Sequence, residues 1–128
     1  MTSDDVRNRV LAYYAAVTAG DVEAVLAMFA ADAEMRDPVG APATSDDMGR
    51  RQRYAGIGAA FDAFAILPEQ IKTGGNEAAA TWTINAHAKT GRDVSFSGIS
   101  AFVFDGDGRI TRMSAFWDPA AIVAAMQA

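Results

Sequence analysis

The stretch Val-Ser-Phe-Ser-Gly-Ile-Ser-Ala-Phe-Val-Phe-Asp-Gly-Asp-Gly-Arg-Ile, residues 94–110, decides the fold class of this chain. Apolar and small polar residues alternate from 94 to 104, which is the pattern of a strand with one buried face. The Asp-Gly-Asp-Gly run at 105–108 is a strong hairpin signal. A partner strand over 109–117 follows, so this part of the chain predicts an antiparallel sheet.

Two more strands are expected upstream, over residues 66–72 and 78–89, with turns at Gly74-Gly75 and Thr90-Gly91. The first half is helical instead. Apolar residues recur at helical spacing from Ser3 or Asp4 to Gly20, and a second helix begins after Asp21. A short extended segment is expected over 34–37. A third helix is expected from Ser45 to about Phe64, and a short helix begins at Asp118.

The expected fold is therefore α+β, with about three N-terminal helices packed on one face of a curved antiparallel sheet. Such a cone-shaped domain encloses a pocket between the helices and the sheet. At 128 residues the chain is expected to form one domain, 1–128.

Composition excludes several classes of function. The net charge of −5, with no basic run, argues against nucleic acid and anionic membranes as partners. There are no cysteines, so disulfides and thiolate chemistry are excluded. The sequence shows no signal peptide and no apolar run long enough to span a bilayer. A cytoplasmic protein is the expectation.

Asp37 is the first candidate functional residue. It follows the two helical patterns and precedes Pro38, which disfavours the α region at Asp37 and favours an extended backbone. A carboxylate held stiffly at the edge of an apolar cleft is a candidate general base. The alternative is that Asp-Pro only starts a turn.

Ser100 is the second candidate, because it is the one polar side chain on the apolar face of its strand. A hydroxyl on such a wall needs a partner. It serves either as a hydrogen-bond donor in a pocket or as a serine bonded to a backbone carbonyl.

Four motifs are informative together. They are Tyr13-Tyr14-Ala-Ala-Val-Thr-Ala-Gly-Asp-Val-Glu-Ala at 13–24, Met-Phe-Ala-Ala-Asp-Ala at 28–33, Asp-Pro-Val-Gly at 37–40, and the ending Phe-Asp-x-x-Gly-Arg-Ile-x-x-Met-x-Ala-Phe-Trp at 104–117. With these motifs the chain resembles the Δ5-3-ketosteroid isomerases of the NTF2-like (SnoaL-like) superfamily. The match covers nearly the whole chain.

The resemblance implies specific roles. Asp37 matches the general base that moves a proton between two ring carbons of a steroid. Tyr13 matches the phenol that hydrogen-bonds the dienolate oxygen, and Tyr54 matches a tyrosine that supports it. Trp117 matches a residue packed beside the base and the substrate. Phe29 stands where other members have a further tyrosine, so that hydroxyl is missing here.

The largest departure from the family is Ser100, where the family has a protonated aspartic acid. A serine hydroxyl still donates one hydrogen bond, although it is less acidic. The expected substrate pocket also includes Val17, Phe29, Phe102 and Met113. The proton transfer that these residues suit requires no cofactor or metal. The resemblance implies a homodimer formed through one face of the sheet.

Other polar residues are interpreted as structural. His87 lies with threonines and an asparagine on the polar side of its strand, where a solvated or interface role is expected. The run at 105–108 lacks the glutamate of a calcium loop. Arg50, Arg51 and Arg53 are expected on a solvated helix face.

One conflict and two alternative functions stay open. Alternation makes Trp82, Ile84 and Ala86 one apolar row, whereas the family register points the other residues of strand 78–89 toward the pocket, so no pocket residue is assigned there. The alternatives to an isomerase are another enzyme on this scaffold (epoxide hydrolase, polyketide cyclase or dehydratase) and a non-catalytic dimeric binding module for a small apolar ligand.

Overall fold

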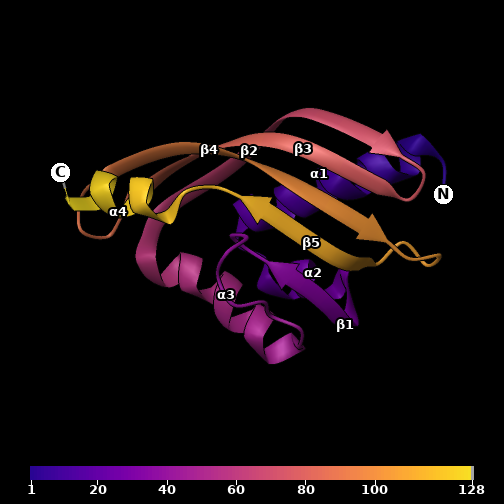
Figure 1. Ribbon diagram of the computed structural model, residues 1–128. Coiled ribbons are helices and arrows are strands. Elements are labelled where there is room, and N and C mark those ends of the chain that lie inside the picture. The colour runs from indigo at the N-terminus through magenta and orange to yellow at the C-terminus, as the bar shows by residue number, and fades with distance from the viewer. Residues whose placement is uncertain (128) are drawn as a thin grey trace.

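A computed structural model describes residues 1–127. It shows an α+β fold in which one curved, open sheet arches over helices (Figure 1). The helices are α1 (Ser3–Ala19), α2 (Val22–Ala27), α3 (Asp47–Ala60) and α4 (Pro119–Gln127). The strands are β1 (Phe29–Arg36), β2 (Phe61–Gly74), β3 (Glu77–Ala88), β4 (Asp93–Phe104) and β5 (Ile110–Phe116), in the order β1-β5-β4-β3-β2. The expected fold class is confirmed.

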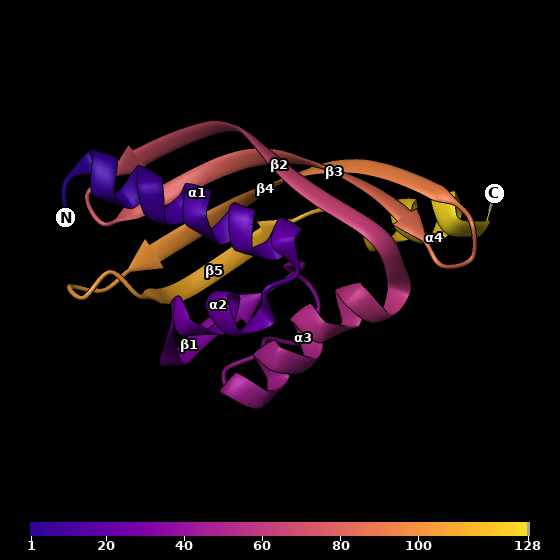
Figure 2. The same ribbon diagram turned by 180° about the vertical axis from the view of Figure 1, so that it is seen from behind.

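α1 is fixed at both ends by its sequence. Thr2, one residue before the expected cap, accepts a hydrogen bond from the Asp5 backbone while the Asp5 carboxylate bonds back to Thr2, which forms a capping box. Gly20 ends the helix in the left-handed conformation, with φ of 70°. The predicted apolar stripe is buried and faces the sheet, along which α1 runs (Figure 2).

The hairpins are formed as predicted, because β2–β3, β3–β4 and β4–β5 all pair antiparallel. The Asp105 carboxylate accepts hydrogen bonds from the backbone N–H groups of Asp107 and Arg109, so the turn at 105–108 is stabilised by its own side chain. In the part of the chain that the structure describes, no helix has both the length and the apolar content needed to cross a membrane.

The prediction of a wholly antiparallel sheet is wrong at one edge. β1 is eight residues long, not a short segment over 34–37, and it pairs parallel to β5, with Phe29 opposite Ile110 and Met35 opposite Met113. Its small and charged residues give no clean alternation, so the strand forms through pairing with a segment far along the chain.

The third helix is also shorter than predicted. It ends at Ala60, and residues 61–64 begin β2, where Phe61 pairs with Ala88 and Phe64 with Ala86. Gly56 and Gly58 weaken the last turns of the helix. Pairing of these residues with β3 stabilises the extended conformation instead.

The structure resolves the conflict on β3 in favour of simple alternation. Trp82 and Ile84 are buried on the face toward the helices. Asn85 and His87 lie on the opposite face, where His87 Nδ1 is 2.8 Å from Asp93 Oδ1. Trp82 pairs with Gly98, so its indole crosses the face of β4 that also holds Ser100.

Candidate active site

A cavity of about 400 Å³ lies between the helices and the concave side of the sheet. This volume is within the range of small-molecule sites. Its lining is mostly apolar and aromatic, with few polar groups. The lining residues are Tyr13, Val17, Asp37, Gln52, Arg53, Tyr54, Gly56, Ile57, Ala60, Phe61, Phe64, Ile66, Trp82, Ile84, Phe96, Ser100, Met113, Ala115, Trp117 and Ile122.

Asp37 is the carboxylate in this lining. It lies in the bend directly after β1, and the following segment is held against β5 because the Val39 N–H donates to the Ala115 carbonyl at 2.8 Å. That contact brings the end of β1 next to the end of β5, where Trp117 lies. The indole Nε1–H of Trp117 donates to Asp37 Oδ1 at 2.7 Å.

A second group contacts the same oxygen. Arg53 Nη2 is 3.5 Å from Asp37 Oδ1, and the guanidinium also lies over the Trp117 ring, 5.8 Å from its centroid. The Asp37 side chain is only 17% exposed. Because both partners contact Oδ1, Oδ2 is the oxygen available to take a proton from a ligand.

Tyr13 and Tyr54 form the buried hydroxyl pair of the cavity. Their hydroxyl oxygens are 2.7 Å apart, and the Tyr54 oxygen lies 3.4 Å from Met35 Sδ. Burial raises the pKa of Tyr13 well above its ordinary value, and Tyr54 and Asp37 raise it further. Burial, followed by the Asp37 charge, also raises the pKa of Tyr54. Both phenols are therefore neutral donors at neutral pH.

Alkaline titration of the tyrosines should show that their hydroxyls are buried. Burial also raises the pKa of Tyr14, so all three tyrosines favour the neutral phenol when folded. The stability that the neutral phenols contribute to the folded protein is complete below about pH 10, the pKa of tyrosine in the unfolded chain. It is lost as the pH rises toward the higher pKa values of the folded tyrosines. We expect the ultraviolet absorbance of tyrosinate to stay absent at pH 10 in folded protein and to appear there in denaturant-unfolded protein. Equal titration curves for the two would contradict the buried hydroxyl pair.

Ser100 is buried, with 3% exposure, and lines the same cavity. Its hydroxyl oxygen accepts a hydrogen bond from the indole Nε1–H of Trp82 at 2.9 Å. The expected alternative, a bond from Ser100 to a backbone carbonyl, is not found among residues 1–127. No pattern in the sequence indicated Trp82 as the partner of Ser100, because the face of β3 was ambiguous.

The remaining expected pocket residues divide into two groups. Val17, Tyr54, Met113 and Trp117 line the cavity with Tyr13, Asp37 and Ser100. Phe29 and Phe102 are buried behind Tyr13 instead, with ring centroids 6.3 and 5.3 Å from its own and edge-on geometry. These two rings hold the Tyr13 ring in place and are not part of the lining.

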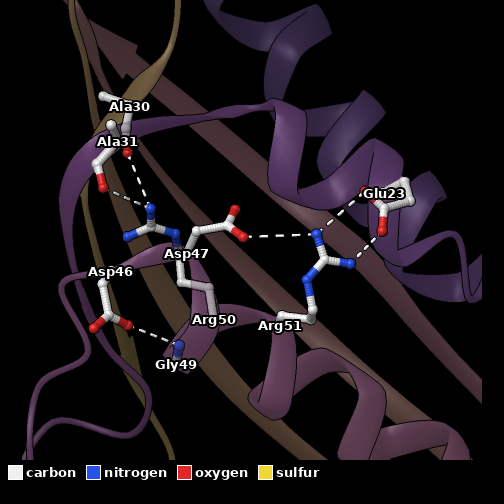
Figure 3. Close-up of polar contacts among 8 residues, drawn as sticks. All are labelled: Glu23, Ala30, Ala31, Asp46, Asp47, Gly49, Arg50 and Arg51. Carbon is white, nitrogen blue, oxygen red and sulfur yellow. Dashed lines mark hydrogen bonds and ion pairs between the residues drawn. The ribbon is translucent and has the colours of Figure 1, made fainter.

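The solvated-face prediction for the three arginines of α3 is wrong for Arg50. Its side chain is 1% exposed, and its guanidinium donates to the carbonyls of Ala30, Ala31 and Ala33 (Figure 3 shows the first two). It thereby satisfies backbone groups along β1. One feature of the sequence could have indicated this burial. Arg50 stands four residues before Tyr54, so the two side chains lie on the same side of the helix.

The other two arginines differ from each other. Arg51 meets the prediction, because it is exposed and pairs with Glu23 and Asp47 (Figure 3). Arg53 is also exposed, but it lines the cavity as well and contacts Asp37. No pattern in the sequence indicated this, since the distance between helix α3 and the end of β1 depends on the tertiary fold. Among residues 1–127, no group of three or more potential metal ligands occurs.

Comparison with known proteins identifies the family. The SnoaL-like domain model matches residues 10–113. The chain belongs to the SnoaL-like family. It is 31% identical over 121 residues to a steroid Delta-isomerase from Nocardioides simplex, an alignment covering 94% of this chain and 96% of that one.

A solved structure agrees with this fold. The epoxide hydrolase/cyclase-like enzyme SalBIII, studied for its role in pyran ring formation in polyether salinomycin, superposes with a TM-score of 0.84. It is 23% identical, and the match covers 92% of this chain and 94% of that one. At this identity the likeness is one of fold.

Proposed function

We propose that this SnoaL-like protein is a steroid Δ-isomerase, which converts 3-oxo-Δ5-steroids to 3-oxo-Δ4-steroids without a cofactor. The observation that carries the proposal is the placement of one carboxylate, Asp37, in an aromatic cavity that also holds the hydroxyls of Tyr13 and Ser100. The likeness to the isomerase of Nocardioides simplex supports the same reaction.

In the proposed reaction, Asp37 removes a proton from the carbon between the ketone and the double bond. The C–H bond breaks, an O–H bond forms on the carboxyl group, and the electron pair moves onto the ketone oxygen to give a dienolate. Asp37 then returns the same proton to the far end of the conjugated system. Trp117 holds Oδ1 throughout, which keeps Oδ2 directed at the substrate.

The dienolate oxygen needs donors in a water-poor site. Tyr54 has two choices for its own proton, Tyr13 or Met35 Sδ. A thioether is a weak acceptor. When an oxyanion binds, Tyr54 donates to Tyr13, and Tyr13 then donates to the oxyanion. Ser100 supplies the second donor. We also propose that the cavity is the deep apolar pocket expected for a steroid, with Phe61, Phe64 and Phe96 contacting the ring system.

The direct test is turnover of 5-androstene-3,17-dione by the folded wild type, followed by the absorbance of the conjugated enone. Isomerisation well above the buffer rate supports the proposal. If the steroid binds without turnover, the binding-module alternative replaces it.

Replacing Ser100 with aspartic acid tests the second donor. The indole of Trp82 is in place to donate to a carboxyl group at this position. Ser100→Asp is therefore expected to have a kcat equal to the wild-type value or up to about tenfold higher, because a neutral carboxylic acid is the stronger donor. Steady-state kinetics on the same steroid measure this. A large loss of kcat in a folded Ser100→Asp protein would contradict the role.

A second reaction has one specific observation in its favour. Arg53 places a cation beside Asp37 in the cavity. A cation next to a carboxylate suits a reaction in which an oxygen of the substrate becomes anionic near the base, as in the opening of an epoxide. We propose epoxide hydrolysis or cyclisation as the second candidate. Product formation from an epoxy-alcohol, in the absence of steroid turnover, would select it.

We further propose that the outer face of the sheet is a homodimer interface. Leu67, Ile99 and Phe116 are about half exposed there, and the strand pairing puts all three on the face opposite the cavity. Exposed apolar side chains grouped in this way mark interfaces. Sedimentation equilibrium is expected to give a dimer for the wild type and a monomer for Ile99→Lys. A monomeric wild type at micromolar concentration would contradict the proposal.

A further inference from the structure

The Ser100 hydroxyl has more hydrogen-bonding capacity than a simple donor needs. A serine oxygen accepts two hydrogen bonds and donates one. The indole Nε1–H of Trp82, which is only a donor, lies 2.9 Å from it. One lone pair of Ser100 is thus filled by Trp82, and the proton of Ser100 takes no part in that bond.

A second donor lies next to Ser100. The hydroxyl oxygen of Tyr14 is buried and has no hydrogen-bond partner of good geometry among residues 1–127. Burial raises the pKa of Tyr14, and the Ser100 hydroxyl opposes that rise because it lies close enough to stabilise a phenolate oxygen there. A small adjustment lets the Tyr14 proton fill the second lone pair of Ser100. This satisfies a buried phenol that is otherwise left without a partner.

The indole of Trp82 is held in one position by its neighbours. Gly98 is its strand partner, and a Cβ atom on Gly98 would clash with the indole Cζ2 and lie 2.7 Å from the Phe116 carbonyl oxygen. Phe96 packs edge-on against the same indole, 5.8 Å between centroids. The direction of the Trp82 N–H is therefore fixed by packing before any ligand enters.

We propose that Trp82 and Tyr14 are positioning residues, which donate to the two lone pairs of Ser100 and so direct its single proton to a ligand oxygen in the cavity. This inference rests on the proposed function, in which that ligand oxygen is the dienolate. Hydrogen bonds in a chain polarise one another. A serine whose oxygen accepts two hydrogen bonds is a stronger donor, which compensates for the absence of a carboxylic acid.

A double-mutant cycle tests the proposal, using Tyr14→Phe, Trp82→Phe and Ser100→Ala in the full chain. Alone, Tyr14→Phe and Trp82→Phe should each lower kcat for the steroid about 3- to 10-fold, the range of one hydrogen bond, with KM nearly unchanged. Combined with Ser100→Ala, each should have less than about a twofold further effect. The matched control is Ser97→Ala, which removes a hydroxyl from the other face of the same strand, where it contacts Thr83.

Equal effects of Tyr14→Phe in the wild-type and Ser100→Ala backgrounds would overturn the proposal, because a purely structural role does not depend on Ser100. Tyr14→Phe keeps the test decisive if Trp82→Phe fails to fold, since it removes only a hydroxyl and keeps the ring that packs against Tyr13 and Phe102.

A binding experiment separates this inference from the proposed function. The probe is 4-nitrophenol in the Asp37→Asn protein, where visible absorbance reports how much of the bound phenol is ionised. Loss of bound phenolate in Tyr14→Phe, and no further loss when Ser100→Ala is present, supports the positioning role even if the wild type does not isomerise steroids. Phenolate binding that is independent of Ser100 would overturn it.

Discussion

Asp37→Asn is expected to lower kcat for 5-androstene-3,17-dione by about 10²- to 10⁴-fold, the contribution of a well-placed general base. The amide has the shape of the carboxylate but cannot accept the substrate proton. Its oxygen still accepts from the indole of Trp117, so the loop after β1 should keep its position. The affinity for the neutral steroid should change by less than about threefold, because a neutral ligand gains little from the charge.

The measurement pairs enone absorbance, for turnover, with quenching of tryptophan fluorescence, for steroid binding. The matched control is Asp32→Asn, which removes an exposed carboxylate from β1, the strand that precedes Asp37. It should retain wild-type kcat. A folded Asp37→Asn protein with more than a tenth of wild-type activity would exclude Asp37 as the base. Loss of binding together with turnover would indicate a structural role.

Tyr13→Phe should lower kcat by about 10²- to 10³-fold, as when one donor to an oxyanion is removed. The substitution leaves the ring, and therefore its edge-on contacts with Phe29 and Phe102, in place. The Tyr54 hydroxyl loses its neighbour at 2.7 Å and cannot replace it at the ligand without moving. KM should change much less than kcat, because the donor acts mainly on the charged intermediate.

Tyr54→Phe is the matched control for Tyr13→Phe. Because Tyr54 acts on the ligand through Tyr13, its removal should cost about tenfold at most, the range of a single hydrogen bond. If Tyr54→Phe lowered kcat more than Tyr13→Phe, then Tyr54 would be the direct donor. If Tyr13→Phe retained kcat within about threefold of wild type, Tyr13 would have no part in the reaction.

The residue patterns within single helices and strands predicted correctly which side chains face the core. The α1 stripe that carries Tyr13 is buried as its helical spacing indicated, and Ser100 lies on the inner face of β4 as alternation indicated. Both patterns follow from backbone geometry alone, since side chains repeat every 3.6 residues in helices and every second residue in strands. The helix predicted to continue to Phe64 ends earlier, because residues 61–64 pair with β3.

The arginines of α3 show where such patterns stop. The grouping of three arginines suggested one solvated face, yet Arg50 is buried against β1, while Arg51 and Arg53 are exposed and Arg53 also lines the cavity. The reason is that β1 pairs parallel with β5, which places its carbonyl groups against α3. Two parallel strands cannot be joined by a short turn, so no local turn motif in the sequence indicates that β1 and β5 pair.

Apart from β1 and the end of α3, the sequence by itself determined the elements of this protein: the capped helices, the antiparallel hairpins, and the face on which Tyr13 and Ser100 lie. Only the tertiary structure decided which side chains meet, because those contacts join residues far apart in the chain. Asp37 meets Trp117 across 80 positions, Tyr13 meets Tyr54 across 41, and Trp82 meets Ser100 on adjacent strands. Each contact depends on register and on the approach of helix to sheet, which no local pattern encodes.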